Sequence, residues 1–224
     1  MSEAVGQVAK ASVAGVARVL DDAPLQSQFC LPRGVLGRIV GWVMSRENQR
    51  MNRATVDLLR AGPQDSVLEL GFGPGQAIDL LVKRSRATWI AGVDPSDVMI
   101  EQATALNQNS IDAGRVTLYR ATAEQLPFPL SHFSKAFAIN NFQIWSSPEA
   151  GLVEVRRVLK PGGTLVLCLR RAARRPRFWT SPGLTAREIE DVRLLLERNQ
   201  FQDVQVVKRW LAQRTACIVA TKPI

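Results

Sequence analysis

Short apolar runs alternate with longer mixed stretches through the middle of the chain, from about residue 64 to residue 167. The run 67–70 is short and is followed at once by glycines, which is typical of a buried strand. Residues 76–84 then predict a helix. Further apolar runs predict strands over 89–94, 133–140 and 164–167. Because strands and helices alternate in this way, the pattern predicts a doubly wound α/β sheet.

The last part of the chain predicts one more helix and two strands. Thr185 is a suitable N-cap, and Glu188 stands at the spacing of its capping-box partner, so a helix is expected to run from there to about residue 199. Residues 201–210 and 215–221 then predict a closing antiparallel pair of strands.

The N-terminal part of the chain has a different pattern. Residues 1–22 are rich in Ala and Val, and the apolar positions lie close to one helical face. Such a helix is expected to pack on the domain or on a second subunit, with membrane-surface binding as the alternative. Pro24 and Pro32 mark a linker before the next apolar segment. We therefore divide the chain into a helical extension or lid, residues 1–50, and a domain, residues 51–224.

A glycine-rich loop follows the first predicted strand of the domain. Glycines 71, 73 and 75 allow a sharp turn and close approach of a ligand. A dinucleotide-binding loop would have a small residue at position 76, where this chain has Gln76. Glu69 precedes the glycines, and a carboxylate there suits a ligand with a cation, such as an ammonium or a sulfonium.

The second predicted strand ends in Asp94, about 20 residues after the glycine loop. A carboxylate at this spacing is placed to bind the ribose hydroxyls of a nucleoside. Together with the segments 120–129, 140–145 and 152–167, these features resemble the class I S-adenosylmethionine-dependent methyltransferases. The resemblance implies a Rossmann-like sheet of seven strands with the last one antiparallel. It also implies S-adenosylmethionine as cofactor and S-adenosylhomocysteine as product. Because the sequence has no Cys-x-x-Cys motif and no Cys/His cluster, no structural metal is expected.

The resemblance also assigns residues. It implies that the cofactor is bound by Glu69, Gly71, Gly73, Gly75, Asp94, Pro95, Ser96, Met99, Ala123, Glu124 and Asn140. The acceptor side is expected to include Asn48, Met51, Asn141, Gln143 and Trp145. Two positions depart from the family pattern, because Thr122 and Ser134 stand where many relatives carry an Asp. The second departure leaves Lys135 at the entry of the fourth strand.

Net charge and cysteines limit the possible partners. The chain carries a net charge of +9, and five arginines gather in residues 170–177, a segment that could face RNA phosphates, an anionic membrane or an acidic substrate, or be a solvated loop. The three cysteines are Cys30, Cys168 and Cys217, and their separation favours buried, reduced thiols. With no long apolar run and no secretory signal, a cytoplasmic protein is expected.

No general base is evident. His132 is the only histidine and is expected in a turn before the fourth strand, while the single tyrosine, Tyr119, is expected to be structural. We therefore expect methyl transfer to a small, lipophilic acceptor at nitrogen, sulfur or activated carbon, as in quinone C-methyltransferases and phospholipid N-methyltransferases. The alternatives are an RNA or protein methyltransferase that uses residues 170–177, and a non-catalytic cofactor-binding module.

Overall fold

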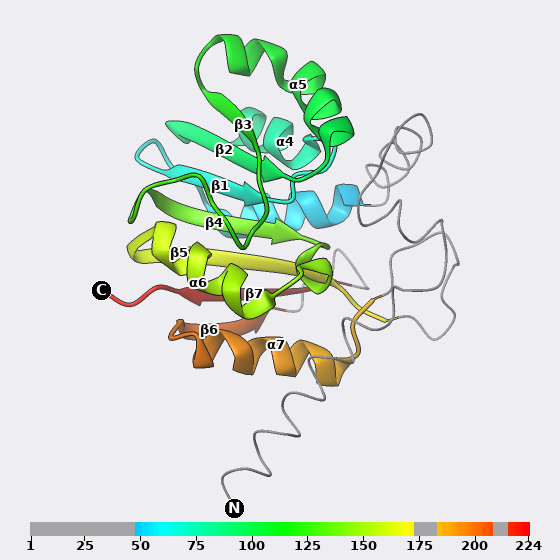
Figure 1. Cartoon of the computed structure of the whole chain (residues 1–224), viewed down its shortest axis with the longest axis vertical. Coiled ribbons are helices and arrows are strands. Elements are labelled where there is room, and N and C mark those ends of the chain that lie inside the picture. The colour runs from blue at the N-terminus through cyan, green and yellow to red at the C-terminus, as the bar shows by residue number, and fades with distance from the viewer. Residues whose placement is uncertain (1–47, 173–182, 208–214) are drawn as a thin grey trace, which may run out of the picture.

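The computed structural model describes residues 48–172, 183–207 and 215–224. Within these residues the strands form one seven-stranded sheet in the order β3-β2-β1-β4-β5-β7-β6 (Figure 1). The strands are β1 (Ser66–Leu70), β2 (Trp89–Asp94), β3 (Val116–Arg120), β4 (Phe133–Ile139), β5 (Leu159–Arg170), β6 (Gln202–Val207) and β7 (Thr215–Thr221). Strands β1 to β5 pair in parallel, and β7 runs antiparallel to both β5 and β6. The predicted doubly wound sheet with an antiparallel last strand is confirmed.

Helices cover both faces of the sheet (Figure 1). The described helices are residues 48–59, α4 (Gln76–Arg84), α5 (Asp97–Asp112), α6 (Pro148–Val158) and α7 (Ala186–Arg198), with a short 3₁₀ turn, η2 (Phe142–Ile144). The predicted boundary at residue 50 falls inside the first of these helices, and residues 1–47, with the expected N-terminal helix, lie outside the described residues. No described helix has the length and apolarity needed to cross a membrane.

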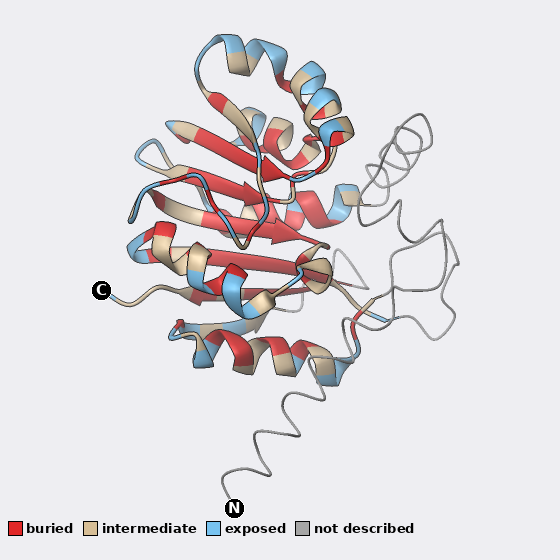
Figure 2. Cartoon of the chain, in the orientation of Figure 1, coloured by how far each residue is buried: buried red, intermediate tan, exposed pale blue. Residues whose placement is uncertain are grey.

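The side chains of each central strand alternate between two buried layers, as a pleated strand requires. On β1, Leu68 and Leu70 join the layer under α6 and α7, whereas Val67 joins the layer under α4, α5 and helix 48–59. Both layers are free of solvent, so the centre of the sheet is buried throughout (Figure 2). This burial makes the sheet a rigid support for the loops at its ends.

The capping box predicted for α7 is present. The Thr185 hydroxyl accepts a hydrogen bond from the Glu188 backbone N–H, and the Glu188 carboxylate accepts one from the Thr185 backbone N–H. These two bonds satisfy N–H groups that have no partner within the helix. The helix therefore begins where the sequence predicts.

One element differs from its prediction. The sequence predicts the fifth strand over residues 164–167, but β5 already begins at Leu159. The reason is long-range pairing, because the Gly162 N–H donates to the Lys222 carbonyl at 2.9 Å and the Lys222 N–H donates to the Gly163 carbonyl at 2.8 Å. Chain beyond β7 thus draws this segment into the sheet.

Candidate functional site

The carboxyl ends of β1, β2, β4 and β5 point the same way, so the loops that follow them meet at one edge of the sheet (Figure 1). This edge carries the glycine loop after β1, the turn into α5 after β2, and residues 140–145 after β4. Ligands of open α/β sheets bind at this edge, where the strand order reverses. In this fold the reversal lies between β1 and β4.

The three glycines of the loop all have positive φ, but each is needed for a different reason. A side chain at Gly71 would collide with the amide of Asn141, and one at Gly75 would come within 2.7 Å of the Ala103 Cβ on α5. Only Gly73 has open space, since a Cβ there would meet nothing nearer than the Met99 sulfur at 4.0 Å. Gly73 is therefore the glycine at which a ligand can approach the backbone.

Asp94 ties this loop to α5. One of its carboxylate oxygens accepts the Gly73 N–H and the other accepts the Ser96 N–H, both at 2.9 Å. Burial raises the pKa of Asp94, and the two backbone hydrogen bonds act in the opposite direction. Because each carboxylate oxygen can accept a second hydrogen bond, Asp94 can hold the loop and still receive hydroxyl donors.

Glu69, on β1, is only 2% exposed, and its Oε2 has no hydrogen-bond partner. Burial raises the pKa of Glu69 well above its ordinary value, and the nearby charge of Asp94 raises it further. A buried polar atom without a partner is costly and calls for an explanation in a folded protein. A ligand that brings a hydrogen-bond donor or a positive charge to this position would provide one.

Asn141 joins the β4 loop to the glycine loop. Its side-chain nitrogen donates to the carbonyls of Leu70 at 2.6 Å and Gly71 at 2.9 Å, and its side-chain oxygen accepts the Trp145 indole N–H at 3.3 Å. The Trp145 ring in turn packs on Gly151 of α6, where no larger residue would fit. The amide of Asn141 thus links the end of β1 to the loop after β4, and its expected place on the acceptor side stays a prediction.

Two further predicted residues make contacts within the protein. Gln143 donates to the carbonyl of Asn140, one of the predicted cofactor residues, at 3.2 Å. Glu124 accepts the Ser147 N–H at 3.1 Å and so links the loop after β3 to the start of α6. These contacts shape the edge without closing off the backbone around Gly73.

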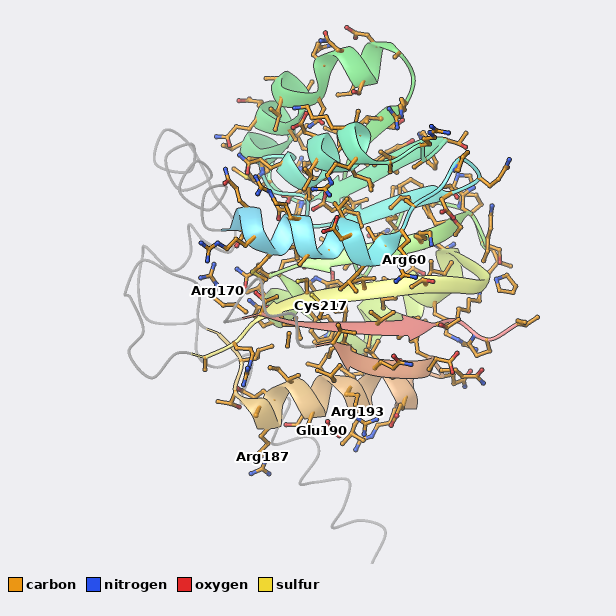
Figure 3. All side chains as sticks on the ribbon, turned by 180° about the vertical axis from the view of Figure 1, so that it is seen from behind. Arg60, Arg170, Arg187, Glu190, Arg193 and Cys217 are labelled. Atoms are coloured by element: carbon orange, nitrogen blue, oxygen red, sulfur yellow. The ribbon has the colours of Figure 1, made fainter. Side chains whose placement is uncertain are left out.

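The remaining predicted residues lie around this edge or beneath it. Pro95 is exposed and Ser96 is buried at the start of α5, whereas Met99 and Ala123 are buried in opposite layers of the core. Met51 is a core residue of helix 48–59. Asn48, from the same helix, accepts a hydrogen bond from Arg170 at 3.2 Å, near the end of β5 (Figure 3).

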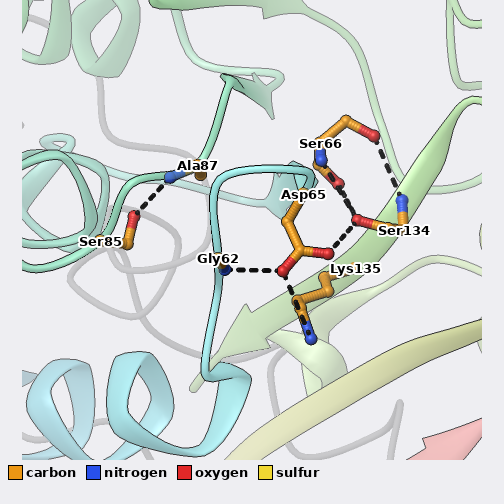
Figure 4. A network of polar contacts seen from close by, with 7 residues as sticks. All are labelled: Gly62, Asp65, Ser66, Ser85, Ala87, Ser134 and Lys135. Carbon is orange, nitrogen blue, oxygen red and sulfur yellow. Dashed lines mark hydrogen bonds and ion pairs between the residues drawn. The ribbon is translucent and has the colours of Figure 1, made fainter.

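Ser134 lies at the opposite edge of the sheet, where β4 begins. Its hydroxyl donates to Asp65 at 2.7 Å and accepts the Ser66 N–H at 3.1 Å, while Lys135 forms an ion pair with the same Asp65 (Figure 4). Asp65 thus supplies the carboxylate that the family pattern places at position 134. This network lies at the amino end of β4, whereas the glycine loop lies at the carboxyl edge.

Of the two candidate bases, His132 lies at the amino edge of the sheet. His132 precedes β4 and contacts the rings of Trp89, at the start of β2, and Phe133. Tyr119 packs edge-on against Phe128 at 5.0 Å. Both predictions, a turn histidine and a structural tyrosine, agree with these contacts. Thr122 is exposed and forms an isolated antiparallel β-bridge with Gln125.

Cys168 and Cys217 face each other directly across β5 and β7, and both are buried free thiols. Their sulfur atoms are 2.7 Å apart. Burial, followed by the contact with Cys217, raises the pKa of Cys168 well above its ordinary value. Among the described residues no group of His, Cys, Asp and Glu could hold a metal ion.

One part of this region was not predicted, a clamp on the loop after β3. Arg157 of α6 donates to the carbonyls of Phe128 at 2.7 Å and Leu126 at 3.1 Å, and its partner Glu154 accepts the Leu126 N–H at 3.0 Å. The bonded Arg157 lowers the pKa of Glu154. Glu154 and Arg157 are three residues apart on α6, and this spacing is the only feature of the sequence that indicates their contact.

The amino-acid sequence is similar to those of known methyltransferases. The model of a family described as a methyltransferase domain matches residues 67–163. The uncharacterized methyltransferase YdaC of Bacillus subtilis (strain 168) is 33% identical over 131 residues, which cover 58% of this chain and 70% of that protein. A ubiquinone/menaquinone biosynthesis C-methyltransferase of Shewanella pealeana is 34% identical over 137 residues, or 58% of this chain, and this match spans about half (52%) of its length.

The fold agrees with these sequence matches. The crystal structure of a SAM-dependent methyltransferase from Aquifex aeolicus superposes with a TM-score of 0.64 at 20% identity, covering 76% of this chain and 89% of that one. At this identity the likeness concerns the fold. The overall fold is thus that of a known methyltransferase.

Proposed function

Because this chain belongs to the class I S-adenosylmethionine-dependent methyltransferases, we propose that it methylates a small, lipophilic acceptor at nitrogen, sulfur or activated carbon. S-adenosylmethionine is its methyl donor. When bound, this cofactor supplies a methyl group on a positively charged sulfur, which a nucleophile displaces in line. The enzyme's task is then to align the two molecules and to exclude water.

Three observations support binding of the cofactor at the carboxyl edge. The open space at Gly73 admits a ligand to the backbone, Asp94 has acceptor capacity for a ribose diol, and the partnerless Oε2 of Glu69 suits an ammonium group. On this proposal Pro95, Ser96 and Met99 border one side of the adenine, and Ala123 and Glu124 border its other edge. The Arg157 clamp holds the loop that carries Ala123 and Glu124.

Among the described residues, the one histidine lies far from this edge and the segment after β4 offers no base, and these two observations support the proposed acceptor class. The chain has one histidine and one tyrosine, and the contacts of His132 place it where β2 and β4 begin, at the far edge of the sheet. The described residues after β4 offer amides and aromatic rings, namely Asn141, Phe142, Gln143 and Trp145. Because none of these takes up a proton at neutral pH, the acceptor must already be nucleophilic.

Methyl transfer from labelled S-adenosylmethionine to a panel of acceptors tests this proposal. We expect transfer to lipophilic amines, thiols or quinol-like rings and none to unactivated alcohols, with loss of all transfer in Asp94→Ala. Equal transfer to alcohols would contradict the proposed acceptor class.

An RNA or protein acceptor remains the alternative, and it rests on the arginines of 170–177. Most of that segment, and the N-terminal helix considered for membrane contact, lie outside the described residues. Transfer to RNA that falls steeply with added salt would favour this alternative, since phosphate contacts release counterions.

A further inference from the structure

Two buried carboxyl groups stand at the ends of adjacent strands, and their hydrogen bonding differs. Asp94, at the end of β2, accepts two backbone N–H groups. Glu69, on β1, is more deeply buried and leaves Oε2 without any partner. An ionised carboxylate in the position of Glu69 would have no donor to stabilise the charge at that oxygen.

The surroundings of Glu69 supply no cation among the described residues. Its neighbours on the adjoining strands are Gly92 of β2 and Phe137 of β4, both uncharged. Alternation along β1 turns Glu69 toward the layer of Val67, where helix 48–59 contributes apolar residues such as Met51 and Leu59, and α4 contributes Ile78. The charged group that acts on Glu69 is Asp94, which has the same sign.

A carboxyl group in such a place is most stable when it is neutral. Removing an unpaired carboxylate from water is so unfavourable that the group keeps its proton rather than bear a buried charge. The direction of the pKa shift of Glu69, upward through burial and then through Asp94, agrees with this argument. A cation that arrives beside the carboxyl reverses the preference, because it favours the ionised form.

We propose that Glu69 carries a proton in the ligand-free enzyme and releases it to solvent when the ammonium group of the cofactor binds beside it. The inference rests on the proposed cofactor site and deepens it. The balance is simple, since a neutral carboxyl and an ammonium become a carboxylate–ammonium pair plus one proton in the buffer. Cofactor binding and the ionisation of Glu69 are then a single coupled event.

This coupling gives cofactor affinity a definite dependence on pH. The affinity for the cofactor should rise with pH, because Glu69 becomes easier to ionise. The rise should stop at about pH 7.7 to 8.0, where the α-amino group of the ligand loses its own proton. The clearest test is therefore made at about pH 6, where the ligand's amine is fully protonated.

The test is calorimetric titration of the full chain with S-adenosylhomocysteine in buffers of different ionisation enthalpy, for example phosphate and imidazole. The difference in observed heat between buffers gives the number of protons released. 5′-Methylthioadenosine, which keeps the nucleoside but lacks the ammonium group, is the matched ligand, because any release from Asp94 on ribose binding would appear with it too. Glu69→Gln is the matched variant, since it keeps the shape and cannot lose a proton.

We expect proton release with S-adenosylhomocysteine and the wild-type chain, and little release with 5′-methylthioadenosine or with Glu69→Gln. The inference is wrong if S-adenosylhomocysteine binds without release of protons, or if Glu69→Gln releases as many protons as the wild type. The cofactor site itself would stand in both cases. If neither ligand binds at all, the proposed site itself is wrong and the inference fails with it.

Discussion

At the scale of single residues, the glycine loop shows that one motif can meet three separate demands. Gly71 leaves room for the Asn141 amide, Gly75 leaves room for α5, and Gly73 leaves room for a ligand. All three have positive φ, which residues with a Cβ adopt only at a cost. The spacing of the motif alone cannot separate these roles, because two of them depend on residues far along the chain.

Gly73→Ala should therefore abolish cofactor binding while costing no more stability than a matched substitution elsewhere. Gly114 provides the match, because it has similar positive φ and also has open space around it. Each substitution should cost about 1 to 2 kcal/mol of stability through the left-handed backbone. Calorimetric titration with S-adenosylhomocysteine and thermal unfolding measure the two effects. Normal binding by Gly73→Ala would remove Gly73 from the site.

The buried carboxyl of Glu69 should also affect stability as pH changes. A carboxyl whose pKa is raised by folding stabilises the protein fully below its ordinary pKa, about 4.3, and this contribution is lost as pH rises toward the folded pKa. Glu69→Gln has no such loss. In thermal unfolding without ligand, its Tm relative to wild type should thus increase from about pH 4 to neutral pH. A difference that does not change with pH would mean that Glu69 is not perturbed by folding.

At the scale of elements, local signals predicted most of the structure. The helix 76–84 and the capping box at Thr185 follow from short stretches of sequence, and the structure has both. The beginning of β5 was not predictable in this way, because residues 160–163 are drawn into the sheet by Lys222. Likewise, nothing in the local sequence shows that Asn141 spans two loops or that Arg157 clamps a third.

The two edges of the sheet have different roles in this account: contacts at the amino edge stabilise the fold, and the carboxyl edge is the proposed binding site. The Asp65–Ser134–Lys135 network joins β1 to β4 at the amino edge, away from the glycine loop. Ser134→Ala leaves the Ser66 N–H and the Asp65 carboxylate without this partner. We expect a loss of about 1 to 3 kcal/mol in the free energy of unfolding, measured in urea, with unchanged affinity for S-adenosylhomocysteine.

The exchange Asp65→Ser with Ser134→Asp provides the control for this network. It moves the carboxylate to the position that the family pattern favours and should restore part of the lost stability. A tenfold loss of cofactor affinity in Ser134→Ala would show instead that the amino edge influences binding.

At the scale of the whole molecule, the chain combines a buried, rigid sheet with an edge at which buried polar groups gather. Glu69, Asp94 and Asn140 are all buried, and all stand at the carboxyl edge. The resemblance of the sequence to the methyltransferase family predicted these three as cofactor residues. Their assignment to the cofactor remains a proposal, which binding measurements on variants can decide.

Calorimetric titration of wild type, Asp94→Ala and Asp97→Ala with S-adenosylhomocysteine tests that assignment most directly. Asp97 is a fair control because it lies three residues away, is exposed, and pairs only at the surface with Arg120. We predict saturable binding by the wild type and by Asp97→Ala, and at least a tenfold weaker binding, about 1.4 kcal/mol, by a folded Asp94→Ala. Equal binding by all three would contradict the proposal that the carboxyl edge of β1 and β2 holds the cofactor.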